Sequence, residues 1–145
     1  MSKRTVYLAY GSNLNIEQMS FRCPDAKPWG ATVLPDYKLT FWGGWGSAVA
    51  TIVSCKGCSV PVALWSISSS DEKALDAYEG FPRLYRKEYL PLKWGGRHVR
   101  AMVYIMNQGL ANPPGRGYFA TILKGYRDFD IHPEPLFRAL RESQE

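Results

Sequence analysis

The stretch that decides the fold is residues 5–22, TVYLAYGSNLNIEQMSFR. Its first half is an apolar run that predicts a short buried strand. The run breaks at Gly11, and by Ile16 the apolar spacing has become that of a helix. Asn15 followed three residues later by Gln18 is typical of the capping arrangement at a helix start. This stretch therefore predicts a strand, a glycine turn and a helix in immediate succession.

A strand that turns through a glycine into a helix directs several free backbone N–H groups at one point. The helix N-terminus adds a partial positive charge there, so the turn suits an anion such as a carboxylate or a phosphate. Ser12 and Asn13 can add side-chain hydrogen bonds to the same point. The alternative is an ordinary turn whose polar residues only cap the helix.

Length and composition favour a single globular domain over residues 1–145, with 46% hydrophobic residues and 14% aromatic ones. No apolar run reaches the length of a membrane span, and no signal peptide is evident, so we expect a cytoplasmic protein with no membrane partner. The net charge of +5 favours anionic partners. Lysine and arginine are scattered rather than grouped, so no nucleic-acid partner is expected. A small anionic metabolite fits the charge as well as nucleic acid does, and ordinary solvated surface charge fits it best.

Three cysteines are present, and without an export signal they are expected to be reduced thiols. Cys55 and Cys58 form a C-x-x-C pair that could be half a zinc site or a redox pair. A second pair of ligands is missing, since Cys23, His98 and His132 are isolated. The intervening Lys-Gly predicts instead a hairpin turn between two strands, and no metal.

The remaining pattern predicts strands and helices in alternation, with few connections long enough for a parallel crossover. This favours an α+β domain with a curved or closed sheet. The helix near residue 70 should have Ser69 as its N-cap, Glu72 at the capping-box position and Gly80 as its C-cap. Turns are expected at Pro35 with Asp36, and between two hairpin strands at 95–96. Strands are expected at 31–34, 37–42, 48–53, 60–67, 85–92 and 98–106, and the later helices at 118–126 and 134–141.

Glu79 is out of place for a surface glutamate, because it falls in the last turn of the predicted helix. A carboxylate there faces the negative end of the helix dipole, and its neighbours Tyr78 and Phe81 are aromatic. Dipole and partial burial both disfavour the ionised form and would raise the pKa. A carboxyl group tuned in this way suits a general base near neutral pH. The alternative is an exposed glutamate beside a helix C-cap.

Together these features resemble the γ-glutamyl cyclotransferase family, and more closely its Y-G-S-N type. Four segments carry the resemblance in order over nearly the whole chain. They are Y-L-A-Y-G-S-N-L at 7–14 with R-C-P at 22–24, A-T-I at 50–52 with L-W at 64–65, L-D-A-Y-E-G at 75–80 with Tyr85, and Pro113 to Tyr118 with Ile122, Gly125 and Tyr126. Tyr78 and the short stretch from Glu79 to Tyr85 depart from the expected pattern.

The resemblance implies a small mixed-sheet β-barrel flanked by helices, with a cavity at the Y-G-S-N loop. It also implies conversion of a γ-glutamyl compound into 5-oxoproline and a free amine, with no metal or cofactor. Carried over by motif, Glu79 is the catalytic acid/base, and the γ-glutamyl substrate is bound by Tyr10, Gly11, Ser12, Asn13, Leu14 and Tyr118. The expected state is a monomer or homodimer.

The implied reaction agrees with the pattern of residues. The α-amine of the glutamyl group attacks its own side-chain carbonyl, so the protein needs only to hold a folded conformer and move protons. Glu79 would take a proton from the ammonium and return one to the leaving nitrogen. The loop N–H groups could hold either the substrate α-carboxylate or the developing oxyanion. The leaving group stays open, as do two other functions: an inactive ligand-binding relative and a basic module that binds nucleic acid or protein.

Overall fold

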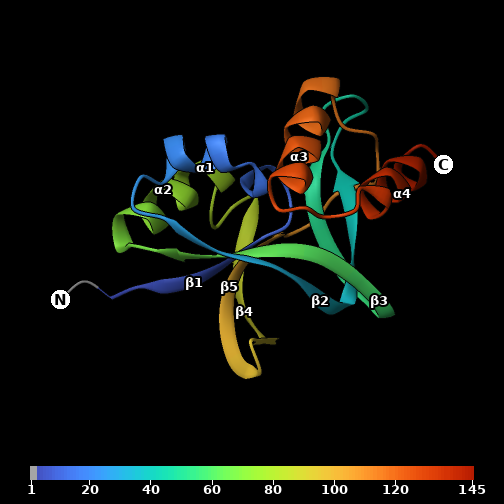
Figure 1. The fold of residues 1–145 in the computed structure, drawn as a ribbon. Helices are drawn as coiled ribbons and strands as arrows, with labels where there is room; N and C mark the ends of the chain where they lie inside the picture. The colour runs from blue at the N-terminus through green and yellow to red at the C-terminus, as the bar shows by residue number, and fades with distance from the viewer. Residues whose placement is uncertain (1–2) are drawn as a thin grey trace.

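The computed structural model describes residues 3–145, and Figure 1 shows its arrangement. The strands are β1 (Thr5–Ala9), β2 (Lys27–Trp42), β3 (Val49–Ile67), β4 (Tyr85–Trp94) and β5 (Arg97–Met106). The helices are a short 3-10 helix η1 (Ser12–Leu14), α1 (Ile16–Arg22), α2 (Ser69–Glu79), α3 (Arg116–Asp128) and α4 (Glu134–Ser143). None of the helices in the described range is long and apolar enough to cross a membrane.

The sheet is mixed, with β1 at its centre in the order β2-β3-β1-β5-β4. β1 runs antiparallel to β3 and parallel to β5, and Tyr7 pairs with residues of both neighbours. Although β2 and β4 are at opposite ends of this order, a Cβ added to Gly30 of β2 would lie 2.9 Å from the Trp94 side chain of β4. The sheet therefore curls until its outer strands meet through side chains, in agreement with the expected α+β class.

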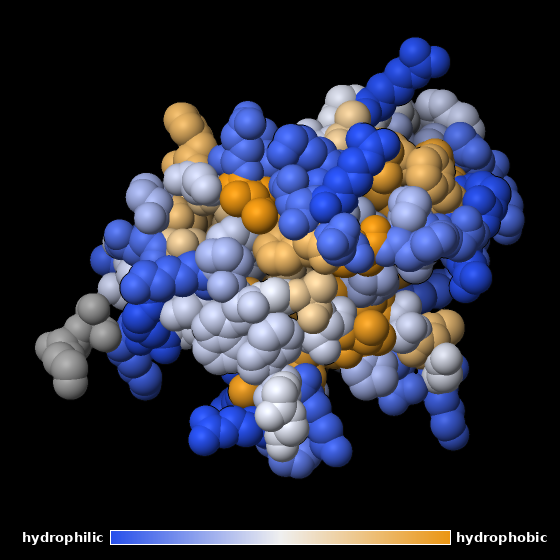
Figure 2. Space-filling view, in the orientation of Figure 1, coloured by the Kyte–Doolittle hydropathy of each residue, from blue (hydrophilic) through white to orange (hydrophobic). Residues whose placement is uncertain are grey.

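Both faces of β1 are buried, which explains its unbroken apolar sequence. Leu8 and Tyr10 belong to one hydrophobic cluster, while Tyr7 and Ala9 belong to a second one on the other face. In Figure 1, α1 and α2 lie beside each other and α4 lies along the long β2–β3 ribbon. Figure 2 shows that apolar surface on this face of the molecule forms areas interrupted by polar side chains. The N-terminal strand is thus the axis around which the core is assembled.

The strands β2 and β3 are longer than the sequence predicts, and two expected turns are absent from them. The predicted strands 48–53 and 60–67 were expected to form a hairpin with each other, but residues 49–67 form the single strand β3, which pairs antiparallel with β2. Asp36 (φ 65°) and Gly57 (φ 84°) form an irregularity inside the continuous ladder, where the Gly57 N–H donates to Asp36 Oδ1 at 3.0 Å. The predicted turns at 35–36 and 56–57 are therefore wrong as strand boundaries, because neighbouring ladder pairs hold the chain extended on both sides.

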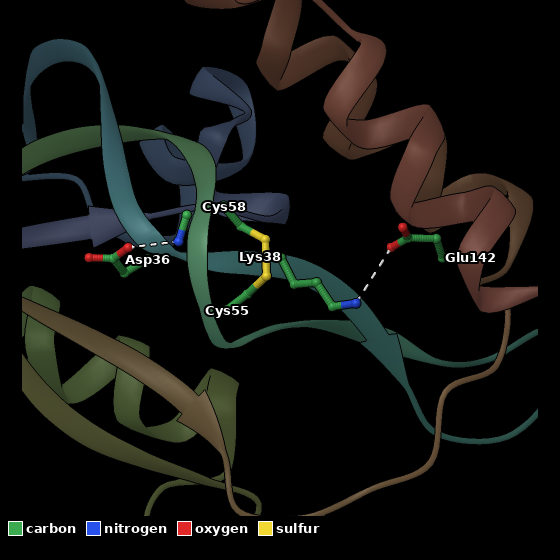
Figure 3. Close-up of a disulfide and its surroundings, with 6 residues drawn as sticks. Asp36, Lys38, Cys55, Cys58 and Glu142 are labelled. Carbon is green, nitrogen blue, oxygen red and sulfur yellow. Dashed lines mark hydrogen bonds and ion pairs between the residues drawn. A yellow bond between two sulfur atoms is a disulfide. The ribbon is translucent and has the colours of Figure 1, made fainter.

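Cys55 and Cys58 are joined by a disulfide in this irregularity, so the expectation of reduced thiols is wrong for this pair (Figure 3). The local geometry brings their Cα atoms to 5.4 Å, within the range that a disulfide requires. Cys23 remains a free and buried thiol. On the neighbouring β2 segment, Lys38 Nζ lies 3.9 Å from Glu142 Oε1, and this ion pair connects β2 to α4.

The helix caps explain where α1 and α2 begin and end. Asn15 caps α1 by accepting from the Gln18 N–H at 2.9 Å, which confirms the predicted cap. In α2 the N-cap is Ser68 and its capping-box partner is Asp71, each one residue earlier than predicted. The predicted C-cap is confirmed at Gly80, whose φ of 67° is left-handed and favours glycine. This cap ends α2 at Glu79.

Candidate active site

The end of β1 opens into a small cavity at the centre of the fold. Its volume is about 20 Å³, enough for about one water molecule. β1 and the following loop supply one wall, while β3, α2, β4, β5 and α3 each supply at least one side chain to the rest. The lining residues are Tyr7, Tyr10, Gly11, Ser12, Asn13, Ala50, Glu79, Tyr85, Tyr104 and Tyr118.

Six of the seven residues predicted for the site line this cavity, from Tyr10 to Asn13 together with Glu79 and Tyr118. Leu14 does not line it, since its side chain is fully buried in the hydrophobic core. The sequence reasoning did not assign Tyr7, Ala50, Tyr85 or Tyr104 to the site. The sequence pattern does not distinguish these residues, because a tyrosine that faces inward from a strand has the same pattern as any other core residue.

The tyrosine hydroxyls are fixed by the backbone of neighbouring strands. Tyr10 donates to the Tyr104 carbonyl at 2.6 Å, and Tyr85 donates to the Ala50 carbonyl at 2.8 Å. The Ala50 N–H donates in turn to the Tyr118 hydroxyl at 2.9 Å. Burial raises the pKa of each of these tyrosines above its ordinary value. Near neutral pH the cavity wall is therefore a set of neutral phenol groups.

The loop after β1 leaves backbone donors free beside the cavity. η1 begins at Ser12, and the first N–H groups of a helix have no intrahelical acceptor. Within residues 3–145, no hydrogen bond is formed by the N–H of Ser12 or Asn13. Their side chains, in contrast, are engaged: Ser12 Oγ lies 2.9 Å from the Tyr78 hydroxyl, and Asn13 Nδ2 donates to the Tyr7 hydroxyl at 2.9 Å. The loop can thus offer main-chain donors to an anionic or carbonyl oxygen.

Glu79 is the one carboxylate in the lining of the cavity. It is the last residue of α2, followed directly by the Gly80 cap, which turns the chain away. Burial raises the pKa of Glu79 from 4.5 to about 7, and the positive charge of Arg22 opposes this rise. Its place at the negative end of the helix dipole acts in the same direction as burial. The carboxyl group can therefore take up and release a proton near neutral pH.

Metal ligation has little support in the part of the chain that the structure describes. No group of three or more His, Cys, Asp or Glu side chains is placed to hold a metal ion there. Cys55 and Cys58 are bonded to each other, away from the cavity residues. The chemistry available to this site is thus that of one carboxyl group, backbone N–H donors and tyrosine hydroxyls.

The sequence and the fold both match known proteins along most of the chain. A gamma-glutamylcyclotransferase of Homo sapiens is 29% identical over 132 aligned residues, covering 85% of this chain and 70% of that relative. The one of Bos taurus is 28% identical over 135 residues with the same coverage. A solved structure described as gamma-glutamyl cyclotransferase superposes with a TM-score of 0.85 at 25% identity, covering 94% of this chain and 86% of that one.

The family model described as "Gamma-glutamyl cyclotransferase, AIG2-like" matches residues 7–126. The matched range begins in β1, includes every residue that lines the cavity, and ends in α3. The chain therefore belongs to the gamma-glutamyl cyclotransferase, AIG2-like family.

Proposed function

We propose that this protein converts a γ-glutamyl compound into 5-oxoproline and a free amine, with Glu79 as general acid and base. The new bond joins the α-nitrogen of the glutamyl group to its own γ-carbonyl carbon, and the bond from that carbon to the leaving nitrogen breaks. Both reacting groups belong to one molecule, so holding it folded supplies much of the rate enhancement.

Proton transfer is the part of the reaction that needs a side chain. An α-ammonium group cannot attack until it loses a proton, and the ring nitrogen must lose a second one after attack. The leaving nitrogen gains two protons if it departs as an ammonium ion, so the reaction neither consumes nor releases protons overall. A single carboxyl group with a pKa near 7 can carry each proton in turn.

The loop after β1 supplies the electrostatic part of the proposal. When the α-nitrogen attacks, negative charge develops on the γ-carbonyl oxygen. The free N–H groups of Ser12 and Asn13 lie beside the cavity and can stabilise that oxygen or hold the α-carboxylate. The buried tyrosines of the cavity wall leave room for about one water molecule, so hydrogen bonds to these donors are stronger than in bulk water.

The observation that carries the proposal is the Glu79 carboxyl group in the cavity with its pKa raised to about 7. Burial and the helix dipole both oppose a negative charge on Glu79 in the last turn of α2, so its carboxyl group is not explained as an ordinary stabilising surface charge. The position of the group beside free backbone donors, in a chain of this family, supports catalysis.

The test is mass-spectrometric detection of 5-oxoproline after the purified protein is incubated with γ-glutamyl-alanine, γ-glutamyl-ethylamide and larger γ-glutamyl compounds. We expect release from at least one of them, and loss of that release in Glu79→Gln. If no compound yields 5-oxoproline although calorimetry shows that they bind, the chain is a binding protein and the proposal fails.

A further inference from the structure

Arg22 borders the candidate active site but does not line the cavity. It is the last residue of α1, and its guanidinium lies 3.5 Å from the centre of the Tyr78 ring in a cation–π contact. It donates from Nη1 to Asn13 Oδ1 and from Nη2 to Gln18 Oε1, the latter at 3.1 Å. Tyr78 is hydrogen-bonded to Ser12, so both ends of the Arg22–Tyr78 pair are attached to the loop that lines the cavity.

The Arg22 guanidinium is not in direct ion-pair contact with any carboxylate among residues 3–145, although its charge is close enough to Glu79 to oppose the rise of that group's pKa. Its side chain is only partly exposed. A guanidinium carries five N–H donors, and the contacts with Asn13 and Gln18 use two of them. The planar group is held in place by the Tyr78 ring, so its remaining donors are preorganised for a planar acceptor such as a carboxylate.

The size of the cavity places part of any substrate near this pair. A volume of about 20 Å³ around Glu79 is far too small for a whole γ-glutamyl compound. The reacting amine and carbonyl must approach Glu79, so the rest of the molecule extends toward solvent. Tyr78 is 44% exposed, and its hydroxyl lies 2.9 Å from Oγ of the lining residue Ser12, so its side chain reaches from the edge of the cavity to solvent.

Resting on the proposed function, we propose that Arg22, held between Tyr78 and Asn13, binds a carboxylate of the γ-glutamyl substrate and sets the preference for substrates that carry it. The carboxylate has two possible sources, the α-carboxylate of the glutamyl group and a carboxylate on the leaving group. In either case the substrate carboxylate is the direct ion-pair partner that Arg22 lacks within residues 3–145.

The test compares Arg22→Met with wild type on three related substrates. γ-Glutamyl-alanine carries both carboxylates, γ-glutamyl-ethylamide lacks the one on the leaving group, and 4-aminobutanoyl-alanine lacks the α-carboxylate and yields 2-pyrrolidinone. We expect Arg22→Met to lower kcat/KM for γ-glutamyl-alanine by roughly 10- to 100-fold relative to one of the two comparison substrates. One comparison substrate should show the smallest change in kcat/KM between wild type and Arg22→Met. The carboxylate that this substrate lacks is the one that Arg22 binds. Arg22→Lys should recover part of the preference, because it keeps the charge without the planar fork.

A change in net charge alone is controlled by Lys73→Met, since Lys73 is exposed on α2 and outside the cavity. Equal losses on all three substrates in Arg22→Met would overturn the inference and leave Arg22 a structural support for Asn13. Calorimetric titration of the same compounds separates this inference from the proposed function. If wild type turns over none of them, a selective loss of affinity in Arg22→Met still supports carboxylate binding, and equal affinities refute it.

Discussion

The substitution Glu79→Gln keeps the size and polarity of the side chain but removes its ability to exchange a proton. We expect kcat for 5-oxoproline release to fall by about 10²–10⁴-fold or more, because one group would serve every proton transfer. In wild type, kcat/KM should rise with pH as Glu79 ionises around pH 7. This limb of the pH profile should disappear in the variant.

The same substitution measures the cost of burying the charge. Burial raises the pKa of Glu79 from 4.5 to about 7, so between these values the folded chain holds a proton that the unfolded chain has released. The free energy of unfolding therefore falls as pH rises through this window, and above it the loss is up to about 3 kcal/mol. Glutamine has no charge to bury. Glu79→Gln should thus be more stable than wild type by up to about 3 kcal/mol at pH 8 and by less than about 1 kcal/mol at pH 5.

Thermal melting of both proteins at the two pH values is the assay, beside the rate measurement on the same preparations. For a chain of this length, a difference of about 3 kcal/mol corresponds to about 6–12 °C in Tm. Glu17→Gln is the matched control, since Glu17 is exposed on α1 and should show no such pH dependence. More than about a tenth of the wild-type rate in Glu79→Gln would refute the acid–base role. An equal Tm difference at pH 5 and pH 8 would refute the burial argument.

Three further substitutions test the surroundings of Glu79. A Cβ at Gly11 would lie 3.2 Å from the Ala50 Cβ, so Gly11→Val should weaken binding of γ-glutamyl-alanine at least tenfold by calorimetry, and an unchanged affinity in the folded variant would contradict this. Tyr118→Phe removes the acceptor of the Ala50 N–H and should cost about 1–3 kcal/mol in chemical denaturation; no loss would mean that the bond does not stabilise the fold. The disulfide joins residues only three positions apart, so the Cys55→Ser, Cys58→Ser double variant should lose at most about 2 kcal/mol of unfolding free energy and keep its activity. A folded but inactive variant would connect the disulfide to function.

The parts of the fold that could be predicted are those fixed by neighbouring residues. The strand, turn and helix of residues 5–22 follow from an apolar run, Gly11 and the Asn15 cap, all within a few positions of one another. The end of α2 follows in the same way, because Gly80 is a local signal for a left-handed C-cap. Glu79 could be singled out for the same reason, since its place in the last turn depends only on that cap.

Features that depend on distant partners could not be predicted. Pro35 and Asp36 are typical of a turn, and only their pairing with β3 keeps the chain extended through them. Arg22 and Tyr78 come from different helices, and no periodicity relates them. The disulfide also depends on tertiary geometry, because the position of Asp36 opposite residues 55–58 determines the local shape of the ladder.

Two small residues, Gly11 and Ala50, line the cavity where the loop after β1 meets β3. A Cβ added to Gly11 would lie 3.2 Å from the Cβ of Ala50 of β3, which is a tight contact. The Ala50 peptide is also where three elements meet: its carbonyl accepts from Tyr85 of β4, and its N–H donates to Tyr118 of α3. The backbone of Ala50 therefore fixes two tyrosines of the cavity wall. Because the Gly11 loop already lies close to the Ala50 side chain, we expect a larger residue at position 50 to press on this loop, to reduce the volume of the cavity and to shift the free N–H donors of Ser12 and Asn13.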